Sequence, residues 1–272
     1  MSWGDGPLAP FDLETTGVNT SEDRIVTGCV AIVPPAGDGP RTPKVFSWMA
    51  DPGIEIPQGA TDVHGITTEY AREHGADAPE VIESIVRQLL VALEQGVPIV
   101  GANLQYDLTL LMHECLRHRI RPLHERMPDG LLAPVVDVMV IDKAADPYRQ
   151  GKRKLTNLAE HYRVKLEGAH DSTADALAAG RIAWRMAQGP IQRTPRHDLA
   201  GNVLPPRRGD PGPLDVGSMK LSDLHAAQVE WKATQSAGLA RYLRGKGESA
   251  DDVRPEWPFV PVASDDATDK LF

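Results

Sequence analysis

The sequence lacks several features that would assign it to a common class of protein. Its 272 residues include two cysteines, Cys29 and Cys115, which are too few for a disulfide scaffold or a structural zinc site. Both lie in apolar segments, so we expect buried thiols in a reducing cytoplasm. No run of about 18 apolar residues is present, so no membrane-spanning helix is expected. The N-terminal "MSWGDGPLAP" also has neither the basic start nor the apolar stretch of a secretory signal. We therefore expect a cytoplasmic protein with no membrane partner.

Positive charge is scarce as well. The chain has 29 lysines and arginines against 38 aspartates and glutamates, a net charge of −9. Domains held to nucleic acid by bulk electrostatics are usually basic. If this protein acts on nucleic acid, the attraction must be local, through metal ions and a few placed basic residues.

The composition that is present, 41% hydrophobic and 25% charged, is typical of a globular protein with one large or two small domains. Apolar β-branched runs predict strands over 25–33, 44–50, 97–103 and 134–142. Helical spacing predicts helices over 79–95, 106–119, 154–162, 172–188 and 221–245. Strands followed by alternating helices and strands indicate an α/β fold with a mixed sheet. We expect a domain over 1–188, a Pro/Gly/Arg-rich linker or arm over 189–218, and a helical extension with an acidic tail over 219–272.

The stretch "FDLETTG", residues 11 to 17, places two acids in a strand-like pattern. Phe11 and Leu13 alternate with Asp12 and Glu14, so both carboxylates share one face, about 7 Å apart. Like charges at that spacing repel unless a cation or a proton relieves them. Taken alone, the pattern is most simply explained as a solvated edge strand.

Three later residues join these two acids: Asp107, His170 and Asp175. Each has an ordinary explanation, since Asp107 suits a helix N-terminus, Ser172 with Asp175 fits a capping box, and His170 suits a solvated loop. Five residues apart on one helix, His170 and Asp175 would diverge. They converge only if His170 precedes the helix and Asp175 lies in its first turn, and the capping signal at Ser172 places the helix start there.

This set of side chains suits phosphodiester hydrolysis. The reaction needs an activated water, neutralisation of the phosphoryl oxygens and a stabilised leaving oxygen, which two divalent ions about 3.5–4 Å apart supply. Carboxylate oxygens favour Mg²⁺ or Mn²⁺, and a histidine near neutral pKa can act as general base.

Three motifs, "FDLETTG", "GANLQYDLTLL" and "HDSTAD", resemble those of the DEDDh 3′–5′ exonucleases, the DnaQ-like group. The resemblance covers residues 7 to about 188 and includes "VHGIT" at 63–67, "VDV" at 136–138 and "KLTNLAEHY" at 154–162. It implies a ribonuclease H-like fold, with a mixed five-stranded sheet flanked by helices and an antiparallel second strand. Two departures are Ala102, where relatives often have histidine, and Pro10, which predicts that the first strand begins late.

The resemblance also implies roles for individual residues. Asp12, Glu14 and Asp175 would hold the metal on the nucleophile side, and Asp12 with Asp107 the second metal. Both would be Mg²⁺, with Mn²⁺ able to substitute, and His170 would be the general base. The residues implied to contact substrate are Leu13, Thr15 and Thr16 at the terminal nucleotide, His64, Gly65 and Ile66 against its base, and Asn103 and Tyr106 along the groove.

The implied function is hydrolysis of single-stranded or frayed 3′ ends of DNA to nucleoside monophosphates, in proofreading or repair. Two alternatives stay open: an RNA-trimming exoribonuclease like RNase T or oligoribonuclease, and a non-catalytic module that binds polymerase or nucleic acid. A DNA polymerase, a homodimeric partner, or a sliding clamp bound through the final "DKLF" are possible partners. A basic cluster (Arg149, Lys152, Arg153, Lys154) would contact phosphates or be solvated. The role of 189–272 is open between an extra packed helix, a partner site and completion of the substrate groove.

Overall fold

The computed structural model describes residues 2–166, 168–195, 200, 202–204 and 212–262. Within them a six-stranded sheet has the order β4-β3-β2-β1-β5-β6. The strands are β1 (Ala9–Thr15), β2 (Ile25–Ile32), β3 (Lys44–Asp51), β4 (Ala76–Asp77), β5 (Ile99–Gly101) and β6 (Val135–Asp137). β2 is antiparallel to both of its neighbours, and the other pairs are parallel. The expected α/β class, mixed sheet and antiparallel second strand are confirmed, and the two-residue β4 adds a sixth strand.

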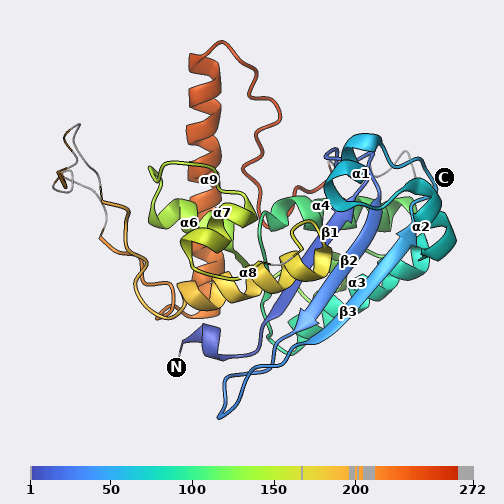
Figure 1. Cartoon of the computed structure of the whole chain (residues 1–272), viewed down its shortest axis with the longest axis horizontal. Helices are drawn as coiled ribbons and strands as arrows, with labels where there is room; N and C mark the ends of the chain where they lie inside the picture. The colour runs from blue at the N-terminus through green and yellow to red at the C-terminus, as the bar shows by residue number, and fades with distance from the viewer. Residues whose placement is uncertain (1, 167, 196–199, 201, 205–211, 263–272) are drawn as a thin grey trace.

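Helices cover both faces of this sheet. They are α1 (Gln58–His64), α2 (Thr68–His74), α3 (Ala78–Glu94), α4 (Leu104–Arg117), α5 (Leu123–Arg126), α6 (Val138–Ala145), α7 (Leu155–His161), α8 (Ser172–Met186) and α9 (Leu221–Gly245), preceded by a 3₁₀ turn at Trp3–Asp5. In Figure 1, α8 crosses in front of β1 and β2 while α3 lies behind them. The apolar stripe of α3, from Val81 to Leu93, packs in the main core with Phe11 and Leu13 of β1. The three short helices α1, α2 and α5 were not anticipated from periodicity.

β1 lies in the middle of the sheet and is tightly covered by α8. The prediction that Pro10 delays the strand is wrong, because β1 begins at Ala9 and pairs Pro10 with Val100 of β5. Proline has no amide to donate, and the continuous pairing of β1 with β2 starts only at Phe11. The Pro10 ring instead packs on α8, where a Cβ at Gly180 would lie 2.6 Å from the Pro10 Cγ. A glycine at this position lets the helix approach the strand closely.

The chain turns from strand to helix at Asp137, which corrects the expected strand over 134–142. β6 ends at Asp137, and its carboxylate accepts hydrogen bonds from the amides of Met139 and Val140 as the N-cap of α6. The apolar residues that follow form the buried face of a helix. A continuous apolar run cannot distinguish these alternatives, whereas a capping aspartate inside it can.

The helix α9 closes the open edge of β6. The fully buried Gln228 accepts from the Asp137 amide at 2.7 Å and donates to the Val135 carbonyl at 2.9 Å, so its side chain substitutes for a neighbouring strand. Nδ1 of His225 accepts from the Val135 amide at 3.2 Å. Two large side chains in the last part of α9, Leu239 and Tyr242, are exposed, where the helix extends beyond the rest of the molecule (Figure 1).

The basic cluster has a structural use at two of its positions. Arg149 and Arg153 both pair with the buried Asp142, at 2.7 and 2.9 Å, and the Tyr162 hydroxyl donates to the same carboxylate at 3.0 Å. These two guanidinium groups are therefore held inside the fold by a buried carboxylate. Cys29 and Cys115 are buried as expected, and burial raises the pKa of their thiols to about 11 and 12. None of the described helices is both long and apolar enough to cross a membrane. The acidic tail and "DKLF" lie outside the described residues.

Candidate active site

The carboxylates of the three motifs meet where β1 and β5 end. Asp12 and Glu14 project from β1, Asp107 lies in the first turn of α4 after β5, and Asp175 lies in the first turn of α8. The buried Asp107 accepts a hydrogen bond from the Leu13 amide at 3.2 Å, which joins α4 to β1. The carboxyl edge of parallel strands is the usual position of a ligand site in an α/β sheet. Asp12 and Asp175, which are 163 positions apart in the sequence, therefore belong to one cluster.

His170 completes this cluster from the loop before α8. Its backbone is left-handed, with φ of 70°, and its amide donates to Oδ2 of Asp175 at 3.3 Å. One ligand atom each of Glu14, His170 and Asp175 lie within 4.8 Å of one another. The expected arrangement, with the histidine in the loop and the aspartate in the first turn, is what the structure has.

The cluster is electrostatically strained. Burial, with the charges of Asp175 and Asp171, raises the pKa of Glu14 to about 7. Burial also raises the pKa of Asp12 well above its usual value, and the charges of Asp107, Asp175 and Glu14 add to this. The pKa values of Asp107 and Asp175 are raised chiefly by burial. Each shift disfavours the ionised form of a carboxyl group that is buried beside other acids.

Two further acids belong to this neighbourhood and were not predicted. Asp171, not Ser172, is the N-cap of α8, and its carboxylate accepts from the amides of Thr173 and Ala174 at 2.9 and 3.0 Å. The buried Asp137 accepts from the amides of Asn103 and Leu104, which sets the start of α4 and hence Asp107. In the sequence, Asp171 directly precedes α8 and Asp137 directly precedes α6, and an aspartate in that position was the signal that could have identified both.

The expected substrate residues on β1 and α4 lie together beside the cluster. The hydroxyls of Thr15 and Tyr106 are 2.7 Å apart, and the Thr15 hydroxyl also donates to the Gly17 carbonyl. Asn103 is exposed at the start of α4, and Leu13 is buried in β1. Thr16 is different, because its buried hydroxyl donates to Asp23 at 2.7 Å and accepts from the Arg24 amide. That hydroxyl supports the loop after β1.

The "VHGIT" segment forms the end of α1. His64 ends the helix, Gly65 follows with φ of 78°, and the Ile66 amide donates to Nδ1 of His64 at 3.1 Å. The pKa of His64 is lowered by burial and also by the charge of His170. This effect places His64 near His170 of the cluster.

The donor set fits hard divalent cations. The candidate ligand atoms are carboxylate oxygens, with the His170 imidazole close to them, and an oxygen-rich set suits Mg²⁺ or Mn²⁺. Oδ1 of Asp175 is buried without a hydrogen-bond partner among the described residues, although buried carboxylate oxygens are normally satisfied. A buried carboxylate oxygen with no hydrogen-bond partner, in a side chain grouped with Glu14 and His170, is what a metal ligand would provide.

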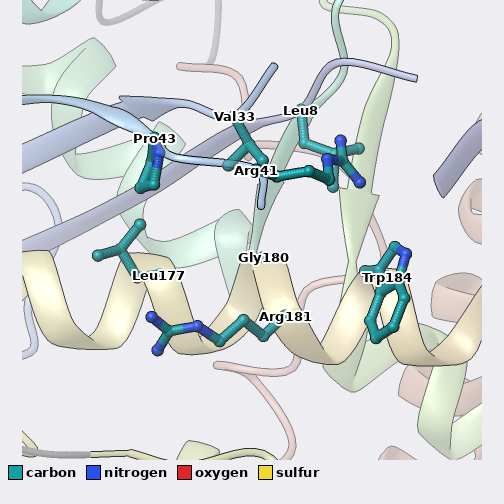
Figure 2. Close-up of a pocket in the computed structure, with 8 residues that line it drawn as sticks. All are labelled: Leu8, Val33, Arg41, Pro43, Leu177, Gly180, Arg181 and Trp184. Atoms are coloured by element: carbon teal, nitrogen blue, oxygen red, sulfur yellow. The ribbon is translucent and has the colours of Figure 1, made fainter. Parts of the chain in front are cut away.

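A separate cavity of about 270 Å³ lies beside the C-terminal half of α8 (Figure 2). Leu177 and Trp184 of α8 face Val33 and Pro43 from the connection between β2 and β3 across it. The nearby Arg41 guanidinium donates to the backbone carbonyls of Pro34, Gly4 and Gly6. No member of the acidic cluster lines this cavity, which separates it from the candidate active site.

The family model described as Exonuclease (RNase_T) matches residues 10–183, a range that contains the whole cluster. The chain belongs to the exonuclease family. Its matched part is a DnaQ-like 3′–5′ exonuclease domain, as the motifs predicted. This family depends on divalent metal, and the cluster of carboxylates and histidine agrees with that dependence.

Several relatives of this exonuclease domain are parts of polymerase proteins. The chain is 27% identical over 176 residues to "DNA polymerase III PolC-type" of Lacticaseibacillus paracasei, covering 65% of this chain and 11% of that protein. It is 29% identical over 181 residues to "DNA polymerase III subunit epsilon-like protein" of Rhodobacter capsulatus, covering 65% and 23%. The chain thus spans under a quarter of the length of these relatives.

Solved structures share the fold. E. coli Exonuclease I in complex with a dT13 oligonucleotide matches with a TM-score of 0.54 and 20% identity, over 67% of this chain and 41% of that chain. This similarity confirms the ribonuclease H-like class for the exonuclease domain.

Proposed function

We propose that this chain removes nucleotides from single-stranded or frayed 3′ ends of DNA in a reaction that depends on two Mg²⁺ ions, with Mn²⁺ able to substitute. The observation that carries the proposal is the convergence of four carboxylates and one histidine from β1, α4, α8 and the loop before α8. Their mutual repulsion is explained if cations normally lie among them.

We assign the residues as follows. Asp12, Glu14 and Asp175 hold the cation on the nucleophile side, and Asp12 and Asp107 hold the second. When bound, the cations activate a water, neutralise the phosphoryl oxygens and stabilise the leaving oxygen. A ring nitrogen of His170 accepts the proton of the attacking water. The water oxygen bonds to phosphorus while the bond from phosphorus to the 3′ oxygen of the preceding nucleotide breaks. The products are a nucleoside 5′-monophosphate and a strand with a new 3′ hydroxyl, protonated from solvent.

The contacts around the cluster support a terminal nucleotide as the substrate. The residues assigned to it are Leu13, Thr15 and Thr16 at the end of β1, Asn103 and Tyr106 at the start of α4, and His64, Gly65 and Ile66 at the end of α1, with the Tyr106 hydroxyl 2.7 Å from that of Thr15 and His64 near His170. DNA is favoured because the relatives include PolC-type polymerases and because Exonuclease I was solved with a DNA oligonucleotide. A role in proofreading or repair beside a DNA polymerase belongs to the same proposal.

The test is digestion of end-labelled single-stranded DNA and RNA of one sequence, with Mg²⁺, with Mn²⁺ and with EDTA. We expect stepwise shortening from the 3′ end that EDTA abolishes and that is faster on DNA. The Asp12→Ala, Asp175→Ala double variant should be inactive but folded, as judged by circular dichroism. Faster cleavage of RNA would establish the exoribonuclease instead. Undiminished activity of the double variant would refute the assignment, and wild-type inactivity without Mn²⁺ binding would indicate a non-catalytic module.

A further inference from the structure

A groove of about 710 Å³ opens beside the acidic cluster. Its walls come from three parts of the chain: the loop after β1, the first turns of α4, and a segment far along the chain that includes Asp252, Arg254 and Val260. A volume of this size is typical of a ligand site. The third wall lies outside the residues 10–183 that match the exonuclease family.

The groove is continuous with the candidate active site through Tyr106. This residue lines the groove, and its hydroxyl is 2.7 Å from that of Thr15, the residue after Glu14. Asn103 and Gln105 lie on the same wall. A strand whose 3′ end reached the carboxylates would therefore have the groove within reach of its preceding nucleotides.

The third wall is firmly attached to the domain. The Arg254 carbonyl accepts from Ser236 of α9 at 2.8 Å and from the Gln105 side chain, which also donates to the Glu256 carbonyl. The Val260 amide donates to the Thr109 hydroxyl of α4 at 2.9 Å. Between these contacts the buried Trp257 joins the main core. Figure 1 shows this segment returning from the end of α9 toward α4.

Arg254 is the arginine among the described residues that line the groove, where His113 of α4 is the other basic side chain. Its backbone is fixed, while its side chain is exposed and forms no ion pair or hydrogen bond with the parts of the chain that the structure describes. The other described residues that line the groove are mostly neutral amides and hydroxyls, and Asp252 is the one acid in this described lining. In a chain of net charge −9, a single placed guanidinium is the kind of local attraction a phosphate requires.

We propose that residues 252–260 form the outer wall of a groove for the nucleotides that precede the scissile 3′ end, and that Arg254 binds a backbone phosphate there. The inference rests on the proposed function, because it takes a single-stranded nucleic acid as the occupant. The neutral amides and hydroxyls suit a sugar–phosphate backbone of any sequence. Asp252 disfavours a second phosphate nearby, so one contact is expected.

The test compares Arg254→Ala with Arg241→Ala, which removes the same charge from an exposed position of α9 outside the groove. For a 12-nucleotide single-stranded DNA at saturating Mg²⁺, Arg254→Ala should raise KM about fivefold, with kcat little changed. The slope of log KM against log salt should fall by about 0.7, the value for one phosphate contact on a single strand. For a dinucleotide, which is too short to occupy the groove, Arg254→Ala and the wild type should behave alike.

A binding measurement separates this inference from the proposed function. Fluorescence anisotropy of the labelled 12-mer, with Asp12→Asn added to each protein, reports affinity without hydrolysis. Equal affinities and equal salt slopes for the two arginine variants would overturn the groove assignment and leave the exonuclease intact. Binding that depends on Arg254 in these proteins, together with a wild-type chain that never hydrolyses the strand in the kinetic assay, would support the groove and refute the exonuclease proposal.

Discussion

Asp12 shows the cost of the cluster most directly. Its pKa is raised well above the usual value by burial and by the charges of Asp107, Asp175 and Glu14. The ionised Asp12 side chain is therefore energetically unfavourable in this position unless a cation is bound. The same feature makes it a sensitive reporter of metal binding.

We expect Asp12→Asn to unfold in EDTA at a temperature no lower than the wild type, because the amide keeps the shape and removes the repulsion. Mn²⁺ should stabilise the wild type, by about 2.7 kcal/mol per site at one hundred times Kd, and should leave the variant almost unchanged. Thermal unfolding with and without Mn²⁺ measures both effects. Asp38→Asn, at an exposed acid in the connection between β2 and β3, is the control and should behave as the wild type. An equal Mn²⁺ shift in Asp12→Asn would contradict the assignment.

His170 has a role that differs from that of the carboxylates. Because it is proposed to accept a proton, His170→Gln should lower kcat by about 10²–10⁴-fold while KM changes little. The Mn²⁺-induced thermal shift should survive, since the carboxylates are intact. Steady-state kinetics and thermal unfolding of the same preparation check this. Loss of the shift together with activity would make His170 a metal ligand and not a base.

The sequence allowed the acidic cluster to be predicted but not its immediate support. Asp12, Glu14, Asp107 and Asp175 could be predicted because their order and spacing are those of known motifs. Asp171 could not, because Ser172 beside it is an equally good cap, and only the helical geometry decides which side chain reaches two amides. The hydroxyl of Thr16 was likewise expected at the substrate and is used inside its own loop.

At the scale of elements, the contact between α8 and β1 sets the distance from Asp175 to Asp12. Gly180 lies where this contact is tightest, since a Cβ there would come within 2.6 Å of Pro10. Nothing in the helical pattern of 172–188 indicated which glycine or alanine faces the strand.

Gly180→Ala should therefore push α8 from β1. We expect it to lower the free energy of unfolding by about 1–3 kcal/mol and to reduce kcat through the displaced Asp175. The matched control is Gly238→Ala in α9, where a Cβ would meet nothing within 4 Å. That change should stabilise the protein, by about 0.5–1 kcal/mol, without altering kcat. Urea unfolding and kinetics of both variants test the contrast, and similar behaviour of the two would refute it.

Long elements with a clear period were predictable, and short ones were not. The helix 221–245 was predicted to the residue because its pattern is long and glycine ends it. The turn from β6 to α6 was missed because 134–142 is apolar throughout and only the cap at Asp137 divides it. The exposure of Leu239 and Tyr242 at the far end of α9 was not predictable either, since an apolar pattern does not reveal how much of a helix its partner covers.

At the scale of the whole molecule, the region after residue 188 is joined to the sheet and not merely tethered to it. Gln228 and His225 satisfy the edge of β6, and Trp257 packs in the core that contains Phe11. The sequence left the role of this region open because its decisive contacts are polar side chains to backbone, which no hydrophobic pattern reports. We therefore expect the extension and the exonuclease domain to unfold as one unit.

His225 gives this coupling a pH dependence. The buried ring accepts a hydrogen bond from the Val135 amide at Nδ1 and lies 5.0 Å from the Trp257 ring, and burial lowers its pKa. A histidine whose pKa is lowered on folding adds stability that is fully present above about pH 6.5, its unfolded value, and that is lost as pH falls through the folded value. Glu14 acts in the opposite sense, because its raised pKa favours the fold at lower pH, so the two effects must be separated by a variant.

We expect His225→Asn, whose side-chain oxygen can accept from the same amide, to be less stable than the wild type at pH 7.5, because contact with Trp257 is lost. The difference in the free energy of unfolding between the two proteins should narrow as pH falls to 5, because only the wild type has a buried imidazole that must stay neutral in the fold. The contribution of Glu14 is common to both proteins and cancels. Urea unfolding in EDTA at pH 7.5, 6.5, 5.5 and 5 measures the difference, with the fluorescence of tryptophan as one signal and far-ultraviolet circular dichroism as the other. Coincident transitions by the two signals are required if α9 and the sheet unfold together. A difference that stays constant across this range would mean that His225 is not held neutral by the fold, and separate transitions would mean that the extension is a unit of its own.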